Sequence, residues 1–261
     1  MKTDSSILTT HDLTVGYRNG SQQVALLKNL NLSLDKGKLV ALLGQNGAGK
    51  STLLRAMTCD ERPLGGSIEV NGKDLLEMSQ KERSRTLGLV STERIQAGAL
   101  TVTELVGLGR QPHTGFMGRL DSEDIEIVRQ SMADAGIIGK AGEYIASLSD
   151  GERQKAMIAR ALAQETPIII LDEPTAFLDV ASRIETMRLL QTLAHDRGKA
   201  VLLSSHDISQ SLMLADELWL ITTDRQVITG NTSQLVADGA MDRLFTNRSI
   251  HFNPTILDYS F

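Results

Sequence analysis

The nine residues GQNGAGKST, at positions 44–52, constrain the fold of this chain more than any other part of its sequence. They match the pattern G-x-x-x-x-G-K-[ST]. The apolar run LVALLG leads into them and favours a strand, and the residues Leu53, Leu54 and Met57 after them favour an amphipathic helix. A strand, a glycine-rich loop and a helix N-terminus bring backbone N–H groups and the positive end of a helix dipole to one point. The sequence therefore predicts a binding site for the phosphates of a nucleoside triphosphate.

Each part of this loop has an expected contact with the nucleotide. Gly44, Gly47 and Gly49 allow the backbone to curl around the phosphates. The Lys50 ammonium supplies a positive charge to the β and γ phosphates, and the Ser51 hydroxyl is a candidate ligand of Mg²⁺. The complete set of expected nucleotide contacts in the loop is Gly44, Gln45, Asn46, Gly47, Ala48, Gly49, Lys50, Ser51 and Thr52.

The composition is typical of a soluble globular protein with one large domain or two small ones. The chain has 261 residues, of which 41% are apolar and 23% are charged. Its formal net charge of −5 argues against nonspecific nucleic-acid binding as its main role, because such binding needs a positively charged face. No apolar run has the length of a signal-peptide core or a membrane span, so we expect the chain itself to be cytoplasmic.

The chain has three regions with different patterns. Up to residue 72, short β-rich runs bounded by Gly, Asn or Asp predict strands. Residues 73–146 show helical patterns with polar breaks. From residue 148 onward, predicted helices alternate with near-continuous apolar strands such as PIIILD and AVLLSS. This alternation is typical of a buried parallel sheet and predicts an α/β fold.

The clearest helix of the middle region is predicted over SEDIEIVRQSMADAG. Ile125, Val128 and Met132 fall on one helical face, which predicts that this face is buried. Asp121 or Ser122 would cap the start of the helix.

A second candidate site follows the apolar strand PIIILD. Asp172 and Glu173 lie at its carboxyl end, where open α/β sheets bind their ligands. Asp172 is suited to hold Mg²⁺ through its water shell, and Glu173 to act as the base or water-positioning carboxylate in attack on a γ-phosphate. An exposed acidic turn is the alternative, but the phosphate loop upstream favours the catalytic interpretation.

Three further motifs stand in a fixed order around these two sites. LSDGERQKAMIARAL occupies residues 148–162, Asp179 follows LDEP, and His206 lies in SSHD after the next apolar strand. In this order the sequence resembles the ATP-binding-cassette (ABC) ATPases over essentially the whole chain. The resemblance implies an α/β fold with a P-loop NTPase core that contains a parallel sheet, an N-terminal antiparallel β subdomain and an inserted helical subdomain.

The family's organisation implies a single ABC ATPase domain over residues 1–261. Residues 1–90 and 155–261 would form the β-rich subdomain and the core. Residues 91–154 would form the helical subdomain with the signature motif.

The resemblance also implies how ATP and Mg²⁺ are used. Two cassettes form a head-to-tail homodimer, in which each ATP lies between the phosphate loop of one cassette and the signature of the other. Ser149 and Gly151 of the signature would meet the partner's γ-phosphate, and Asp179 would lie in the loop between the two cassettes. His206 would contact the γ-phosphate and hold the attacking water, and Tyr17 would stack on the adenine.

The segment TVTELVGLGRQPHTGFMGRLDSED, residues 101–124, is similar to the branch of importers for iron–siderophore complexes, haem and vitamin B12. This similarity implies an ATP-hydrolysing subunit, peripheral on the cytoplasmic face of the cell membrane, beneath permease subunits and without a nucleic-acid partner. An external substrate-binding protein would deliver the cargo.

Other functions are also open to a cassette of this kind. They are energising another class of ABC transporter, acting on DNA or ribosomes, and serving as a nucleotide-gated regulatory module without turnover. The chain has neither a coiled-coil insertion nor a second cassette, which argues against action on DNA or ribosomes. Glu173 argues against a module without turnover, because a pure switch needs no placed carboxylate.

The sequence departs from the family's pattern at two places. Asp150 and Glu152 stand where the usual signature has Gly and Gln. In LVSTERIQ, an ungapped alignment puts Thr92 where the family has a glutamine that contacts Mg²⁺ and the water and faces the permease. Thr92 is the first candidate for this role, followed by Glu93 and then Gln96, since hydroxyl, carboxylate and amide oxygens all suit Mg²⁺.

Overall fold

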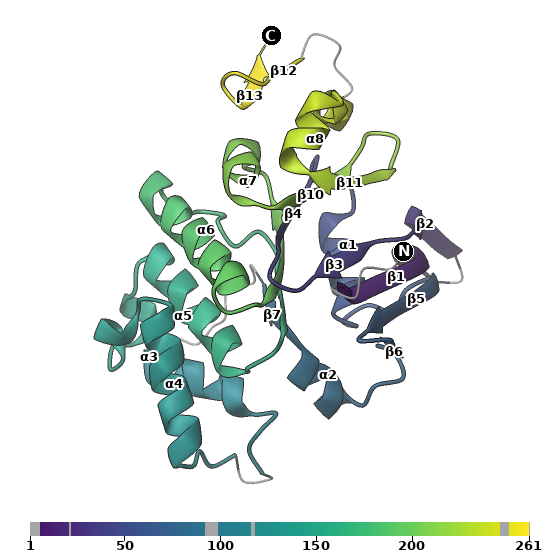
Figure 1. The fold of residues 1–261 in the computed structure, drawn as a ribbon. Helices are drawn as coiled ribbons and strands as arrows, with labels where there is room; N and C mark the ends of the chain where they lie inside the picture. Colours follow the sequence, from purple (N-terminus) through teal and green to yellow (C-terminus); the bar gives the residue numbers. More distant parts are fainter. Residues whose placement is uncertain (1–5, 21, 92–98, 116–117, 246–250, 261) are drawn as a thin grey trace.

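An antiparallel sheet forms the N-terminal part of the molecule (Figure 1). The structure is a computed structural model, and it describes the chain except residues 1–5, 21, 92–98, 116–117, 246–250 and 261. The strand order is β2-β1-β5-β6, with β3 paired to β1. These strands are β1 (Ser6–Asn19), β2 (Gln22–Leu30), β3 (Ser33–Asp35), β5 (Gly65–Val70) and β6 (Lys73–Asp74). The predicted N-terminal antiparallel sheet is confirmed.

A second sheet has the strand order β11-β10-β4-β9-β8-β7. Its strands are β4 (Leu39–Gly44), β7 (Leu87–Val90), β8 (Ile168–Leu171), β9 (Ala200–Ser205), β10 (Glu217–Ile221) and β11 (Val227–Asn231). All neighbours in it are parallel except β11, which runs antiparallel to β10. Every residue of β8 and β9 is buried, as expected for a sheet with both faces covered. The predicted parallel sheet is confirmed.

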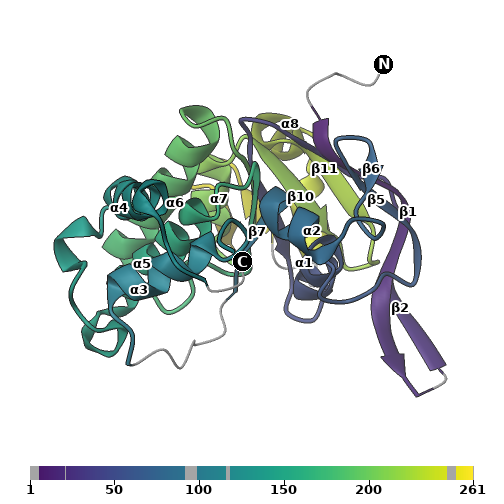
Figure 2. The same cartoon turned by 90° about the horizontal axis from the view of Figure 1, so that it is seen from below.

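Helices lie on both sides of the parallel sheet (Figure 1, Figure 2). The α-helices are α1 (Lys50–Met57), α2 (Gln80–Thr86), α3 (Val102–Gly107), α4 (Ser122–Asp134), α5 (Asp150–Ala163), α6 (Val180–His195), α7 (Ile208–Leu214) and α8 (Thr232–Ala237). Short 3-10 helices are η1 (Leu108–Arg110), η2 (Ile138–Lys140), η3 (Ile145–Ser147) and η4 (Ala240–Leu244). Among the described residues, no helix has both the length and the apolar character needed to span a membrane.

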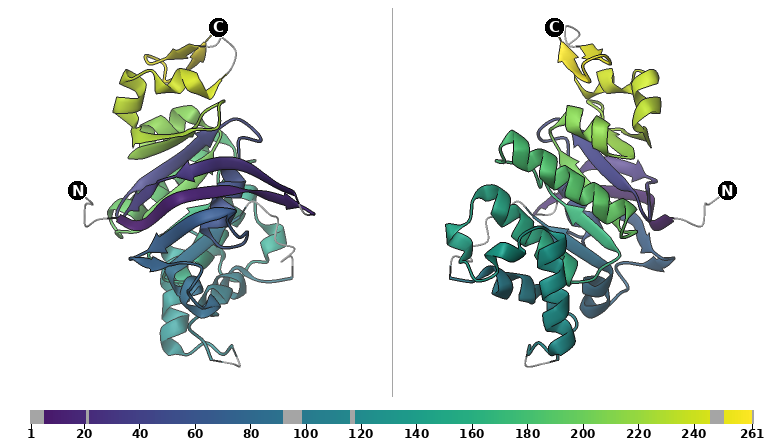
Figure 3. Two further views of the ribbon diagram at one scale, coloured as in Figure 1. Left: turned by 90° about the vertical axis from the view of Figure 1, so that its right-hand side faces the viewer. Right: turned by 60° about the vertical axis from the view of Figure 1, so that its left-hand side comes forward.

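The two ends of the molecule carry different elements (Figure 3). Helices α3 and α4 lie at one end, and the hairpin of β12 (His251–Asn253) and β13 (Asp258–Ser260) lies at the other. Helix α5 runs without a break from Asp150 to Ala163 and contacts α3, α4, α6 and β7. The predicted subdomain boundary after residue 154 therefore falls inside a continuous helix.

The parallel sheet separates two hydrophobic cores. On β4, Val40 and Leu42 belong to the core shared with the antiparallel sheet and α1. Ala41 and Leu43 belong to the core shared with α3, α4, α5 and α6. Successive side chains of a strand point to opposite faces, so a run of consecutive apolar residues is what a strand between two cores requires.

Helix α4 differs from its predicted packing in one residue. Val128 and Met132 are buried, but Ile125 is 59% exposed, so its predicted burial is wrong. The buried face is centred on Asp124 and Val128 instead, because the Asp124 carboxylate pairs with the guanidinium of Arg110 inside the fold. The predicted cap is confirmed at the first alternative, Asp121, whose side chain accepts a hydrogen bond from the Asp124 N–H (2.9 Å).

Candidate functional site

The phosphate loop joins β4 to α1. Gly47 and Gly49 have positive φ angles of 76° and 109°, which glycine adopts without the steric cost of a side chain. The Lys50 side chain is buried, and its Nζ donates to the carbonyl oxygen of Gly44 (2.8 Å). Burial lowers the pKa of Lys50, and the nearby carboxylates of Glu173 and Asp172 act in the opposite direction. The loop thus carries a cation directly at the start of a helix, an arrangement suited to phosphate binding.

Asp172 stands next to this loop, although it is distant in the sequence. Its Oδ1 accepts hydrogen bonds from the hydroxyls of Ser51 (3.3 Å) and Ser204 (2.6 Å). Mg²⁺ is usually bound by one or two carboxylates together with substrate phosphates, and a hydroxyl and a carboxylate oxygen at this distance fit such a partial set of ligands. The described residues contain no group of three or more His, Cys, Asp or Glu side chains that could hold a metal ion.

Glu173 and His206 meet at the carboxyl ends of β8 and β9. The His206 Nε2 lies 2.5 Å from the Glu173 Oε1. Glu173 has a positive φ of 48°, which is uncommon for a residue with a side chain and is often found at functional sites. A hollow of about 380 Å³ opens beside the pair, and Arg183, Asp207 and Asp258 also line it. A carboxylate in contact with an imidazole, beside a phosphate loop, can polarise a water molecule.

The signature motif begins α5, with Ser149 as its N-cap. The Ser149 hydroxyl accepts from the Glu152 N–H (3.3 Å) and donates to the Glu152 carboxylate (2.9 Å), which also accepts from the Ser149 N–H (2.9 Å). Both acidic residues that depart from the usual signature are paired with cations: Asp150 with Arg153 (2.8 Å) and Glu152 with Lys140 (3.5 Å). Their charge is therefore partly neutralised within the chain.

Three other predicted residues lie at element ends or on the surface. A Cβ at Gly151 would lie 2.7 Å from the Ser182 Oγ, so a side chain there would displace Ser182 of α6. Asp179 caps α6, with its carboxylate accepting from the N–H and the hydroxyl of Ser182 (2.9 and 3.0 Å). Tyr17 lies on β1 opposite Val24 and is half exposed.

The loop that replaces the family's glutamine lies outside the described residues. Strand β7 ends at Val90, whose carbonyl oxygen accepts a hydrogen bond from the Asp172 N–H (2.9 Å). Thr92, Glu93 and Gln96 belong to the segment 92–98, so their predicted roles stay predictions.

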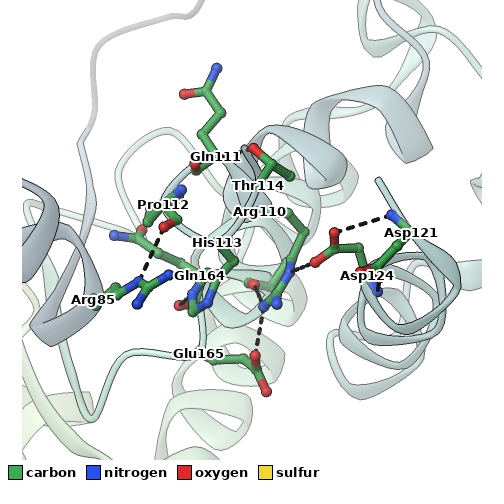
Figure 4. Close-up of polar contacts among 11 residues, drawn as sticks. Arg85, Arg110, Gln111, Pro112, His113, Thr114, Asp121, Asp124, Gln164 and Glu165 are labelled. Carbon is green, nitrogen blue, oxygen red and sulfur yellow. Dashed lines mark hydrogen bonds and ion pairs between the residues drawn. The ribbon is translucent and has the colours of Figure 1, made fainter. Parts of the chain in front are cut away.

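Sequence reasoning did not find two polar residues that the structure places at important positions. Ser204 is completely buried and contacts both acidic residues, Asp172 and Glu173. The sequence feature that could have indicated Ser204 was the pair of serines at the end of the apolar strand AVLLSS. Arg110 is also buried, and Figure 4 shows it between Asp124 and Glu165. The sequence feature that could have indicated a buried arginine was its position as a single charged residue in a stretch of glycine and apolar residues.

A groove runs between α2 and the segment of η1 and α5. Two neighbouring hollows of about 700 and 440 Å³ form it, and they share Gln80, Ser84, Arg160 and Gln164. Figure 4 shows the segment from Arg110 to Thr114 beside it, with the Arg85 Nε donating to the Pro112 carbonyl (3.1 Å). Burial lowers the pKa of Arg160, and within the part of the chain that the structure describes its guanidinium has no ion-pair or hydrogen-bond partner.

Comparison with known sequences shows to which family this chain is related. The family model for the ABC transporter matches residues 27–176, more than half of the chain. The ferric enterobactin transport ATP-binding protein FepC of Escherichia coli (strain K12) is 35% identical over 238 residues, which cover 91% of this chain and 86% of FepC. The iron(3+)-hydroxamate import ATP-binding protein FhuC of Bacillus subtilis (strain 168) is 33% identical over 238 residues, which cover 91% of this chain and 87% of FhuC.

Solved structures agree with this placement. An ABC transporter described as of metal-chelate type, in an inward-facing conformation, is 30% identical with a TM-score of 0.79, over 92% of this chain and 89% of that chain. A dimeric bacterial ABC transporter cassette is 27% identical with a TM-score of 0.74, over 86% of this chain and 98% of that chain. Because the family model, the relatives and the site geometry agree, the chain belongs to the ABC transporter family, as one of its ATP-binding and ATP-hydrolysing cassettes.

Proposed function

We propose that this cassette hydrolyses ATP to energise the import of a metal chelate through a membrane permease. The observation that carries the catalytic part is the contact of Glu173 with His206 beside the phosphate loop. The cargo class rests on FepC and FhuC, whose names specify ferric enterobactin and iron(3+)-hydroxamate transport, and on the structure of metal-chelate type. A relative named for cobalamin import also matches this chain, so the proposed cargo is an iron–siderophore complex, haem or cobalamin, and the ferric siderophore is the first to test.

The five residues of the central site have separate roles in this proposal. Lys50 neutralises charge on the β and γ phosphates, and Ser51 and Asp172 hold Mg²⁺, Asp172 through the water shell. When bound, Mg²⁺ would supply positive charge that neutralises the phosphates. Glu173 accepts a proton from the attacking water, and His206 orients that water and contacts the γ-phosphate. Thr92 stays the first candidate for a further contact with Mg²⁺.

The remaining predicted residues act on the nucleotide between two copies of the chain. Ser149 and the N–H of Gly151, at the start of α5, face the partner's γ-phosphate, where the helix dipole favours a negative group. Asp179 lies in the contact between the cassettes, and Tyr17 offers its exposed ring to the adenine. The related bacterial cassette is dimeric, which supports a dimer of this chain, and the head-to-tail arrangement is part of the proposal.

The groove around Arg160 is the proposed contact with the permease, which keeps the cassette at the cytoplasmic face of the membrane. Lys81 and Arg160 line the larger hollow, and none of the described residues in its lining is acidic. A cytoplasmic helix of the permease that presents a carboxylate, or its own C-terminal carbonyls, would satisfy the Arg160 guanidinium. An external substrate-binding protein delivers the cargo to the permease and does not touch this chain.

Uptake into proteoliposomes tests the proposed function. The complex of this chain and its permease is reconstituted with the binding protein outside and ATP inside. We expect ATP-dependent accumulation of a labelled ferric siderophore, and no accumulation with Glu173→Gln. Accumulation of haem or cobalamin alone would change the cargo, and ATP turnover without movement of any chelate would overturn the import function.

Co-elution tests the permease contact separately. Arg160→Gln should weaken co-elution of the cassette with the permease while leaving ATP binding unchanged. Arg188→Gln, at an exposed position on α6, is the control. Equal co-elution of both variants would remove Arg160 from the proposed contact.

A further inference from the structure

A buried serine hydroxyl joins the two acidic residues of the central site. Ser204 has 0% of its surface exposed. Its Oγ donates a hydrogen bond to the Asp172 Oδ1 (2.6 Å) and accepts one from the backbone N–H of Glu173 (2.8 Å). A buried hydroxyl without partners is unfavourable, and here both its donor and its acceptor are used within the site.

Strand register explains why these groups meet. β8 and β9 are parallel neighbours in which Leu171 is opposite Leu203. Asp172 directly follows the end of β8, and Ser204 is the next residue of β9, so the carboxylate and the hydroxyl lie side by side where β8 ends. Ser204 is also opposite Leu42 of β4, the strand that leads into the phosphate loop.

The hydrogen bonds distinguish the two oxygens of Asp172. Oδ1 accepts hydrogen bonds from the hydroxyls of Ser51 and Ser204. Oδ2 receives no hydrogen bond from the residues that the structure describes. A carboxylate held in this way has one oxygen fixed by the protein and the other free for the water shell of a cation.

The second hydrogen bond acts on the backbone of Glu173. Its φ of 48° lies in the left-handed region, which a residue with a side chain occupies only when its surroundings hold it there. The bond from its N–H to Ser204 is one such restraint, and from this backbone position the Glu173 carboxylate reaches His206.

We propose that Ser204 is a positioning residue of the ATPase site. Its hydroxyl orients the Asp172 carboxylate toward the water shell of Mg²⁺ and fixes the backbone from which Glu173 reaches the attacking water. The inference rests on the proposed roles of Asp172 and Glu173, which have their own tests. Partners of this kind around a metal ligand typically change metal affinity by about 10–100-fold when they are removed.

Nucleotide binding without turnover tests the proposal. In a Glu173→Gln background, the affinity for trinitrophenyl-ATP is measured in EDTA and over a Mg²⁺ titration. We expect Ser204→Ala to raise the half-saturating Mg²⁺ concentration by about 10-fold and to leave the affinity in EDTA unchanged. Ser204→Thr keeps the hydroxyl and should restore the parent value. Thr166→Val, which removes a buried hydroxyl that bonds only the Ile168 carbonyl, is the control.

Each outcome decides between a positioning role and a structural one. An unchanged Mg²⁺ titration in Ser204→Ala, or an equal loss of affinity with and without Mg²⁺, overturns the proposal. If Ser204→Ala does not fold, Ser204→Cys fills nearly the same space with a weaker donor, and a Mg²⁺ titration equal to that of the parent overturns the proposal.

Asp172→Asn separates this proposal from the proposed function beneath it. If Asp172→Asn leaves the Mg²⁺ titration unchanged, the role of Asp172 itself fails. If Asp172→Asn weakens Mg²⁺ binding and Ser204→Ala does not, only the role of Ser204 fails. Ser204→Ala added to Asp172→Asn should cause no further change, because the carboxylate that the hydroxyl orients is then absent.

Discussion

At the scale of single residues, the signature serine is held by its own chain. Ser149 and Glu152 form a capping box, so the hydroxyl expected to face the partner's γ-phosphate donates to the Glu152 carboxylate. Hydrogen bonds from the N–H and hydroxyl of Ser149 hold the pKa of Glu152 below its usual value. Glu152 is therefore charged at neutral pH, and in the proposed dimer the partner's ATP would compete with this carboxylate for the Ser149 hydroxyl.

Removing this charge should favour the ATP-bound dimer. Glu152→Gln keeps a capping-box residue at the third position of the helix but removes a negative charge close to the expected γ-phosphate. In a Glu173→Gln background, the ATP concentration needed for dimerisation should fall by roughly two- to fivefold. Size-exclusion chromatography with ATP measures this.

Glu143→Gln is the control, because Glu143 pairs with the same Lys140 but lies outside α5. A higher ATP requirement in Glu152→Gln than in the parent would show that Glu152 assists the dimer.

Candidate site residues inside a recognisable sequence motif could be named from the sequence. Residues that join the site only through their neighbours in the folded chain could not. Lys50, Asp172 and His206 were recognisable from flanking patterns. Ser204 has its partners on two residues 32 and 31 positions away, which the register of two strands brings next to it. Strand register is set by tertiary packing, which a single sequence does not reveal.

At the scale of elements, a buried arginine joins the helical end of the molecule to the core. The Arg110 Nε donates to Asp124 of α4 (2.8 Å). Its Nη1 donates to the Ala163 carbonyl at the end of α5 (2.7 Å) and to Glu165 (2.6 Å). The three contacts fix η1 against two helices, beside the groove proposed for the permease (Figure 4).

Loss of this arginine should destabilise the fold. Arg110→Ala leaves the Asp124 carboxylate buried without its cation, which typically costs about 3–5 kcal/mol. Urea unfolding of the purified chain measures the change in the free energy of unfolding. Arg129→Ala removes an exposed arginine paired with Glu126 three residues away and should change little. Equal effects of the two variants would contradict the importance of the buried pair.

The same ion pair predicts a pH dependence. The hydrogen bond from Arg110 is the main cause that holds the pKa of Asp124 below its usual value. The pair therefore stabilises the fold above the unfolded-state pKa of about 3.9, and this contribution is lost as the pH falls below that value. Asp124→Asn should reduce the loss of stability between about pH 5 and pH 3. If the free energy of unfolding changes equally with pH in Asp124→Asn and in the unaltered chain, other carboxylates determine the pH dependence of stability, and this prediction is wrong.

The sequence predicted whether a segment forms a helix or a strand better than it predicted which face of a helix is buried. Buried strands were evident because two cores require uninterrupted apolar runs. The face of α4 was mispredicted at Ile125, because an ion pair placed Asp124 in the position that hydrophobic spacing assigns to an apolar side chain.

At the scale of the whole molecule, the residues proposed to contact ATP lie in two separate parts of the fold. The phosphate loop, Asp172, Glu173 and His206 gather at the carboxyl edge of the parallel sheet, whereas Ser149 begins α5, in a different part of the fold. This division explains why a cassette would act as a dimer. The partner's surface and the cargo are not encoded in this chain, so its sequence could indicate them only through resemblance.

Steady-state phosphate release, with ATP binding measured in parallel, tests the central claim most directly. Glu173→Gln replaces the proposed base by a neutral group of the same shape. We expect the rate of phosphate release to fall by roughly 10²–10⁴-fold, the usual contribution of a general base, while ATP binding is retained. Release by Glu173→Gln at the rate of the unaltered chain would contradict the claim that Glu173 activates the attacking water.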